Sequence, residues 1–316
     1  MRAAYPLWFA LEKEAQETLY IKTGELDFGF INSPSMQEVA NSMTRENISY
    51  QTLNATEIKQ RFPQFTIPET MEGLYQEDTG ILKASSCVLS HLKLAQKYGA
   101  IVEDNTPVVN INHKNEEITV KTNNNTYGCQ QLIIAAGSWT KQLLISLGLT
   151  LLLTIMPCQL AFFKVTHSDD FIPGNFPIFL AHLTGNYGQF PYGLPSCDHQ
   201  GLKLSTFYGW DTVETIKEVD YTPSLQWIEN LRTFLKQYLP NANGELIETR
   251  RCLYTMTPDK HFIIDQHPEY ANIFIAAGFS GHGFKFTTLV GKILTDLVIK
   301  KETEYDLSLF KINRFL

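Results

Sequence analysis

The sequence predicts an α/β fold combined with a β-rich region, an α/β plus β architecture. The chain has 316 residues, a length typical of about two domains. Its composition, 44% hydrophobic and 19% charged, is that of a globular protein. Two apolar segments, residues 132–137 and 273–278, end in the same Ile-Ala-Ala-Gly run and each leads toward a helical pattern. Strands that alternate with helices in this way indicate α/β units.

The repeated Ile-Ala-Ala-Gly run has two interpretations. Small residues at the end of a strand let a ligand approach the backbone, and the carboxyl ends of strands are where α/β folds bind ligands. Tight packing between each strand and the helix after it explains the same residues without a ligand. The pattern alone leaves both open.

The N-terminal part predicts a helix, a strand and a second helix. Residues 5–20 carry apolar side chains at helical spacing, and residues 25–28 alternate as a strand does. A second helix is expected over residues 86–98, with Gly99 after its end. The apolar residues that recur at helical spacing there are Val88, Leu89, Leu92 and Ala95.

The rest of the chain predicts a β-meander, a strand-rich middle and a return to α/β. The expected strands are residues 108–111, 117–121, 131–135, 160–165, 189–194, 202–207, 262–265 and 273–277. Helices are expected over residues 224–238 and 287–299. The stripe expected to face the core in the first of these helices is Trp227, Leu231, Leu235 and Tyr238.

Charge and composition exclude several classes of function. The net charge is −7 and no basic tract exists, so we expect no nucleic-acid partner, because neutralising phosphates needs clustered Lys and Arg. No apolar run reaches the ~18 residues that span a bilayer, and the N-terminus lacks a signal-peptide pattern. The five cysteines include no C-x-x-C pair. We therefore expect a cytoplasmic protein with reduced thiols, no membrane association and no metal site.

A glycine-rich stretch at residues 278–285, GFSGHGFK, stands directly before a predicted helix. Its spacing is G-x-x-G-x-G, which is neither the dinucleotide fingerprint nor a P-loop. Backbone N–H groups and the positive helix end could stabilise an anionic ring or carboxylate there, with Lys285 adding a full charge. An ordinary glycine-rich turn with a solvated lysine is the alternative.

A second stretch, residues 251–259, places Cys252 and Tyr254 on one face of an expected strand. A cysteine beside a cationic residue ionises more readily than a buried one. Most lone cysteines only fill a core, so the residue types by themselves favour that simpler interpretation.

Residues 252–286, CLYTMTPDKHFIIDQHPEYANIFIAAGFSGHGFKF, resemble the C-terminal signature of the monomeric sarcosine oxidase family, which includes N-methyltryptophan oxidase. Further agreement lies in LWFALEKE, IKTGELDFG, LIIAAGSWTKQLL, YGLPS, GLKL and TEYDLSLFKINR. The similarity spans nearly the whole chain, and the C-terminal block is its most specific part.

The resemblance implies an FAD enzyme that oxidises the C–N bond of a secondary amine or N-methyl amino acid. A hydride would pass from the carbon beside nitrogen to flavin N5, and O2 would reoxidise the flavin to give H2O2. The implied fold is an incomplete Rossmann-like FAD-binding domain with a mixed-sheet substrate domain. The implied partners are a small-molecule substrate and O2.

The resemblance also assigns residues near the reacting atoms. Cys252 resembles the cysteine that carries FAD as a covalent thioether, and Lys285 resembles the residue that pairs with the substrate carboxylate. Lys203 matches a lysine near flavin N5 that is associated with oxygen activation, where a cation stabilises superoxide. Tyr192 and Tyr254 match aromatic residues that frame the substrate.

Further positions correspond to cofactor contacts by the same resemblance. Gly278, Gly281, His282 and Gly283 match the loop around the flavin ring. Gly137 and Trp139 follow a strand near the cofactor, and Val108 lies where the meander approaches adenine.

Two departures from the family accompany these matches. No G-x-G-x-x-G segment is present, so the first βαβ unit, roughly 30 residues, is expected to be missing together with an arginine for the substrate carboxylate. The expectation is a truncated copy, a misplaced start codon, or one half of a two-chain enzyme whose partner supplies the dinucleotide-binding segment. A non-catalytic remnant is the rival.

The second departure is Phe207, which stands at or next to the place of an active-site histidine that follows GLKL. A phenyl ring cannot hydrogen-bond an amine, so a larger or more apolar amine is expected as substrate.

The resemblance divides the chain into two expected domains. Residues 1–30, 76–145 and 245–316 would form the FAD-binding domain, and residues 31–75 and 146–244 the substrate domain.

Overall fold

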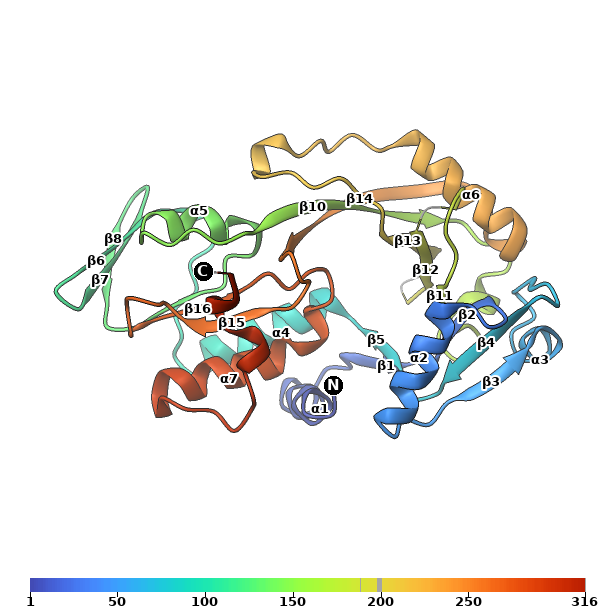
Figure 1. The fold of residues 1–316 in the computed structure, drawn as a ribbon, viewed down its shortest axis with the longest axis horizontal. Helices are drawn as coiled ribbons and strands as arrows, with labels where there is room; N and C mark the ends of the chain where they lie inside the picture. The colour runs from blue at the N-terminus through green and yellow to red at the C-terminus, as the bar shows by residue number, and fades with distance from the viewer. Residues whose placement is uncertain (188, 198–200, 316) are drawn as a thin grey trace.

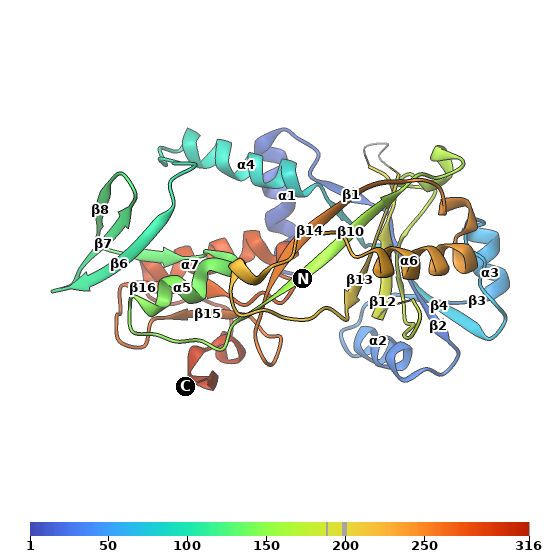
Figure 2. The same cartoon turned by 90° about the horizontal axis from the view of Figure 1, so that it is seen from above.

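The computed structural model describes residues 1–187, 189–197 and 201–315. Within them the chain forms one eight-stranded sheet, two three-stranded sheets and one two-stranded sheet, with helices packed around them (Figure 1). Two long strands, β10 (Thr154–Phe163) and β14 (Leu246–Met256), run side by side along the length of the molecule (Figure 2). The predicted α/β plus β class is confirmed.

The eight-stranded sheet is mixed. Its order is β14-β10-β13-β12-β11-β2-β4-β3, and every neighbouring pair is antiparallel except β11 with β2. Its remaining strands are β13 (Leu202–Tyr208), β12 (Gln189–Leu194), β11 (Ile178–Ala181), β2 (Glu25–Phe30), β4 (Met71–Gln76) and β3 (Gln51–Asn54).

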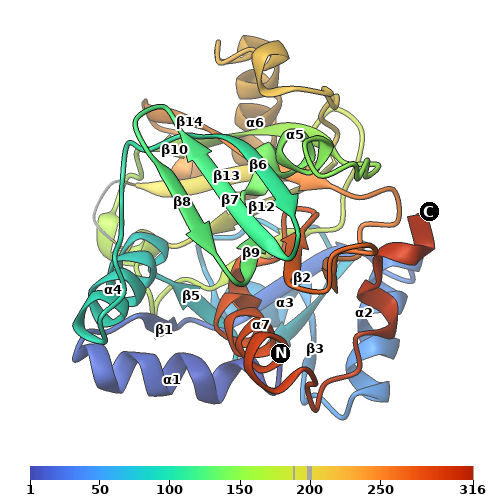
Figure 3. The same cartoon turned by 90° about the vertical axis from the view of Figure 1, so that its left-hand side faces the viewer.

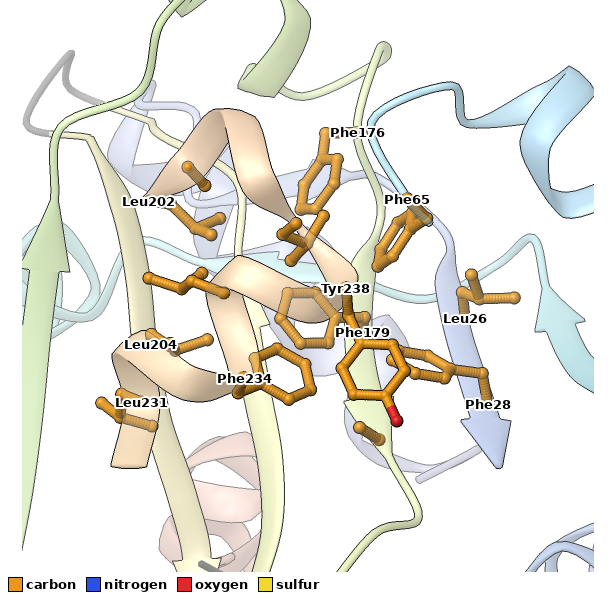
Figure 4. Packing of buried hydrophobic residues seen from close by; sticks show 14 of the residues in the cluster. Leu26, Phe28, Phe65, Phe176, Phe179, Leu202, Leu204, Leu231, Phe234 and Tyr238 are labelled. Carbon is orange, nitrogen blue, oxygen red and sulfur yellow. The ribbon is translucent and has the colours of Figure 1, made fainter. Parts of the chain in front are cut away.

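One face of this sheet packs against helix α6 (Leu225–Tyr238), and the predicted apolar stripe of that helix is buried. Ser224 caps the helix by accepting a hydrogen bond from the backbone N–H of Trp227. The rings of Phe179 and Phe234 stack with centroids 5.8 Å apart in the centre of this core (Figure 4). Short helices α2 (Pro34–Arg45) and α3 (Ala55–Arg61) flank the β2–β4–β3 end of the sheet.

A three-stranded sheet in the order β15-β16-β9 forms the second core, with β15 (Ile263–Gln266), β16 (Ile273–Ala277) and β9 (Leu132–Ile134). The two Ile-Ala-Ala-Gly segments belong to β9 and β16, which are parallel neighbours with Ile134 opposite Ile275. Their carboxyl ends therefore meet at one edge of the sheet. Among the described residues, β9 has no second neighbouring strand.

Helices α1 (Ala4–Ala15), α4 (Ala84–Lys97) and α7 (Thr287–Lys300) gather beside this sheet (Figure 3). The remaining elements are β1 (Tyr20–Lys22) paired with β5 (Gly80–Leu82), the meander β6 (Val108–Lys114), β7 (Glu117–Thr122) and β8 (Thr126–Cys129), and helix α5 (Thr140–Ile145). Within the described residues no helix is long and apolar enough to span a bilayer.

Two helix predictions differ from the structure. The first helix ends at Ala15, because Gln16 adopts a left-handed conformation with φ 53°. In α4 most of the apolar stripe is exposed, including Leu89 at 52%, while Cys87 and Ser90 are buried. Cys87 packs with Trp8 of α1. The spacing located an apolar stripe correctly but could not show which side of the helix α1 would cover.

The two domains expected from the sequence stay a prediction. Strands β2 and β14 fall within residues 1–30 and 245–316, which the resemblance assigned to FAD binding, yet both hydrogen-bond into the eight-stranded sheet. One sheet therefore contains strands from both of the expected domains.

We predict that Leu231→Ala in α6 destabilises the protein by about 3 kcal/mol, since the side chain is fully buried and leaves a cavity. The matched control is Leu225→Ala in the same helix. Leu225 is 76% exposed, so its loss should change stability by no more than about 0.5 kcal/mol. Urea unfolding followed by circular dichroism measures both. Equal destabilisation by the two variants would contradict this view of the core.

Candidate active site

The face of the eight-stranded sheet opposite α6, here called the site face, carries most of the residues predicted for chemistry. Leu202 and Leu204 of β13 lie in the core with α6, so by strand alternation Lys203 and Ser205 point to the site face. Tyr192 of β12 lies opposite Ser205 and shares that face.

Strands β10 and β14 extend the same face. Ala161 and Phe163 of β10 belong to the α6 core, so Cys158 alternates onto the site face. Cys252 of β14 is its register partner, and Tyr254 follows on the same side. Four predicted residues, Lys203, Tyr192, Cys252 and Tyr254, therefore share one face although they come from three strands.

Burial dominates the electrostatics of Lys203 and Cys252. Burial lowers the pKa of Lys203, and the neighbouring Cys252 sulfur is the largest opposing charge. Burial likewise raises the pKa of the Cys252 thiol, against the smaller opposing effects of Lys203 and Arg250. The sequence suggested that a cation beside Cys252 would favour its thiolate. The cation is present, but it acts against a larger cost of desolvation.

Arg251, the cationic neighbour of Cys252 in the sequence, points to the other side. Its guanidinium donates to the backbone oxygens of Pro157 and Thr222, at 3.3 and 2.8 Å. The ammonium that reaches Cys252 comes instead from β13, a strand some fifty residues earlier in the chain. Only the pairing of strands could reveal this.

Tyr254 links the sheet to the glycine-rich loop. Burial is the main cause that raises its pKa, followed by the effect of the adjacent Tyr192. Gly281 has φ +81°, and a Cβ placed there would lie 2.5 Å from Cδ2 of Tyr254. Only glycine allows the loop backbone to lie this close to the ring.

Strand β14 also holds the two turns that follow the Ile-Ala-Ala-Gly strands. The backbone N–H of Ser280 donates to the carbonyl oxygen of Thr255 at 2.9 Å. The hydroxyls of Ser138 and Thr255 lie 3.1 Å apart. Gly278, with φ +62°, sits so close to Thr257 that a Cβ would lie 2.3 Å from its Cγ2. Both turns are thereby fixed against the strand that carries Cys252.

Lys285 lies in the helical turn Phe284–Phe286, just after the glycine-rich loop. Its backbone oxygen accepts a 2.9 Å hydrogen bond from Nε1 of Trp8. Its ammonium is close enough to Glu25 of β2 to oppose the effect of burial, which raises the pKa of Glu25 to about 7. The structure thus places the Lys285 ammonium near the carboxylate of Glu25.

Two further groups of predicted residues line separate hollows. Val108 and Trp139 line one of about 870 Å³, next to the turn that contains Gly137. His282 lines another of about 270 Å³ with Phe262 and Phe286. At Gly283 a Cβ would meet the Phe279 side chain at 2.5 Å. The residues expected at the flavin ring and those expected along the rest of FAD therefore line different hollows, and their roles stay predictions.

Sequence reasoning missed a buried pair on the site face. Nε2 of His182 lies 2.9 Å from Oδ1 of Asp27, and both side chains are more than nine-tenths buried. The available signal was the alternation of Glu25, Leu26, Asp27 and Phe28, which puts two carboxylates on one side of a strand. Within the described residues no group of three His, Cys, Asp or Glu side chains could hold a metal.

A family model described as "FAD dependent oxidoreductase" matches residues 1–297. The chain belongs to this FAD-dependent oxidoreductase family. It is 37% identical to a monomeric sarcosine oxidase of Bacillus sp. (strain B-0618) and 35% identical to a peroxisomal sarcosine oxidase of Homo sapiens. The matches cover 98% and 100% of this chain, and 79% and 81% of those proteins.

Solved structures show the same fold as this FAD-dependent oxidoreductase. An L-proline dehydrogenase from P. horikoshii superposes with a TM-score of 0.86 at 21% identity, over 99% of this chain and 82% of that one. NikD, an amino acid oxidase of nikkomycin biosynthesis, also gives 0.86, at 23% identity over 97% and 80% of the two chains. The resemblance identified from the sequence is confirmed.

The residues present fit FAD in two respects. The turns at Gly137 and Gly278 both have positive φ and end parallel neighbouring strands, which suits close approach of a ligand to the backbone. The hollow beside Trp139 adjoins one of these turns. In such a site Cys252, Lys203 and the backbone around Gly281 would face the cofactor ring.

We predict that in flavin-free protein, where the Cys252 thiol is free, Lys203→Met slows its alkylation by iodoacetamide severalfold at pH 8. The Lys203 ammonium lowers the pKa of Cys252, against the effect of burial. Without the ammonium the pKa rises, so the fraction of reactive thiolate falls. Lys217→Met, on the exposed helical turn at residues 216–218, is the control and should leave the rate unchanged. Peptide mass spectrometry at timed intervals measures the rate. Faster alkylation in Lys203→Met would refute the inferred contact.

Proposed function

We propose that the protein is an FAD-dependent amine oxidase acting on secondary amines of the N-methyl amino acid type. When bound, FAD accepts a hydride at N5 and is reoxidised by O2 to give H2O2. The observation that supports this most is the shared site face, where a cysteine, a buried lysine and two tyrosines from three strands meet. The names of the relatives, sarcosine oxidase and N-methyl-L-tryptophan oxidase, support the substrate class.

Four residues of the site face have proposed roles. Cys252 would hold FAD as a covalent thioether. Lys203, buried and desolvated, would stabilise the negative charge that develops when O2 is reduced, because a fixed cation acts strongly where water is excluded. Tyr192 and Tyr254, which are neighbours on the site face, would form an aromatic wall for the substrate.

Lys285 would pair with the substrate carboxylate. Its neighbour Glu25 bears on this role, because a carboxyl with a pKa of about 7 is only partly ionised at neutral pH and so only partly neutralises the ammonium. Phe207 lies against Tyr192, with ring centroids 6.2 Å apart. This apolar pair favours a larger or more apolar amine over N-methylglycine.

The other cofactor contacts and the domain division are proposed on the same basis. Gly278, Gly281, His282 and Gly283 would surround the flavin ring, and Gly137, Trp139 and Val108 would lie along the rest of FAD. The predicted cytoplasmic location also stays a proposal.

A partner-dependent subunit is the second candidate function. Among the described residues β9 pairs only with β16, and its middle residue, Ile133, is 42% exposed. An unpaired edge with apolar side chains invites another strand. We propose that a partner chain contributing a βαβ segment with a glycine-rich turn would complete the FAD site there.

We predict that the protein expressed with FAD gives a yellow pellet after acid precipitation. Cys252→Ala should give a colourless pellet, because the thioether is lost. Cys87→Ala, a buried thiol between α1 and α4, is the matched control and should stay yellow. Visible absorbance of the redissolved pellet is the measurement. A flavin that remains bound in Cys252→Ala would exclude this anchor.

We predict H2O2 release when the flavin-loaded protein is given N-methyl amino acids, with faster turnover of N-methyltryptophan or pipecolate than of sarcosine. A peroxidase-coupled assay measures it. Faster turnover of sarcosine would contradict the inference from Phe207. A colourless, inactive chain that gains flavin only with a dinucleotide-binding partner would favour the second candidate.

A further inference from the structure

The Asp27–His182 pair lies on the site face but has no role in the function proposed above. Asp27 alternates with Leu26 and Phe28, which both lie in the α6 core, and His182 follows Ala181, which is also in that core. Both side chains therefore point to the site face. The His182 and Asp27 side chains are only 5% and 8% exposed, and Nε2 lies 2.9 Å from Oδ1.

One ring nitrogen of this buried histidine has no partner. Nδ1 of His182 is inaccessible to solvent and makes no hydrogen bond among the residues that the structure describes. Burying a polar atom without a partner is costly, and such atoms in native proteins point to a missing group. With Nε2–H donating to the Asp27 carboxylate, Nδ1 keeps a lone pair. It is then an acceptor, and the missing group is a hydrogen-bond donor.

The surrounding residues hold the ring in place and connect it to the rest of the site. The ring of Phe190 meets that of His182 edge to face at 5.7 Å. A Cβ on Gly29 would lie 3.0 Å from Cβ of His182, so the backbone of β2 limits its movement. Two residues before His182, Leu180 lies opposite Tyr192. His182, just after β11, is thus one strand away from Tyr192 of the aromatic wall.

A carboxylate that fixes an imidazole through one nitrogen and leaves the other free is the arrangement of a general base. The carboxylate sets the tautomer and stabilises the imidazolium after the ring takes a proton. The other charged groups at this end of the sheet are Glu25, on the same strand, and Lys285, which is near Glu25. Neither bonds to the His182 ring.

We propose that His182, oriented by Asp27, removes the proton from the substrate ammonium, an inference that rests on the proposed amine oxidase function. The N–H bond of the secondary ammonium breaks and a new bond forms between that proton and Nδ1. The electron pair stays on the amine nitrogen, which becomes neutral. No atom is oxidised or reduced in this step. Only the neutral amine has the lone pair that expels a hydride from the adjacent carbon.

The kinetic test measures anaerobic reduction of the flavin by an N-methyl amino acid in stopped flow, from pH 6 to pH 10. His182→Gln should reduce the rate at least about 100-fold at pH 7, the magnitude typical of a general base, and Asp27→Asn should also reduce it. The deficit should shrink as the pH approaches the pKa of the free amine, because solvent then removes the proton. A deficit that is constant with pH would overturn the proposal, since it would indicate a merely structural role.

His113→Gln is the matched control. Nε2 of His113 likewise bonds to a side-chain oxygen, that of Asn272 at 3.0 Å, but its ring stacks on Tyr270 in another part of the fold. Its reduction rates should equal those of the original protein at every pH. A His113→Gln deficit with the same pH dependence would overturn the assignment to His182.

A second readout does not depend on turnover or on the variants folding. In protein labelled with 15N-histidine, the His182 signal should show an unprotonated Nδ1 at pH 8 and shift toward imidazolium when N-methylglycine is added. No shift of His182 on saturation with N-methylglycine would overturn the proposal. Failure of every tested amine to reduce the flavin would instead defeat the proposed function, so the two failures are distinguishable.

Discussion

The antiparallel ladder between β10 and β14 is the constraint on which the rest of the structure depends. It pairs Thr154 with Met256 at one end and continues past Cys158 and Cys252. One part of β14 therefore belongs to the eight-stranded sheet and presents Cys252 to the site face. Its last residues, near Thr255 and Thr257, hold the turns after both Ile-Ala-Ala-Gly strands. A single strand thus fixes the position of the sulfur relative to both glycine turns.

Desolvation is the common cause of the unusual ionisation on the site face. It lowers the pKa of Lys203, raises that of Cys252, and raises that of Glu25 to about 7. Acidic and basic groups with shifted pKa values on one face are typical of functional sites. Burying such groups costs free energy, and catalysis or ligand binding is a common reason for it. The proposed chemistry gives Cys252 the flavin and Lys203 the oxygen as partners, while Glu25 lies beside Lys285.

The sequence predicted the local features of the site well, but it did not predict which residues from different strands meet there. Alternation alone placed Cys252 and Tyr254 together, and helical spacing found the buried stripe of α6. Lys203 and Tyr192 were identified only through family resemblance, since nothing local marks them. Asp27 and His182 escaped notice because they are 155 residues apart and meet only through the parallel pairing of β2 with β11. The same limit applies to α4, whose apolar stripe is largely exposed because α1 covers another side of the helix.

By itself the sequence determined which residues can share a face, which segments form strands and helices, and which family the chain resembles. These follow from short-range periodicity and from motifs that are continuous in the chain. The tertiary structure decided which strands are neighbours. It gave Cys252 the ammonium of Lys203 rather than that of Arg251, and gave His182 the carboxylate of Asp27. Register and sheet order depend on packing between distant segments, so no local pattern encodes them.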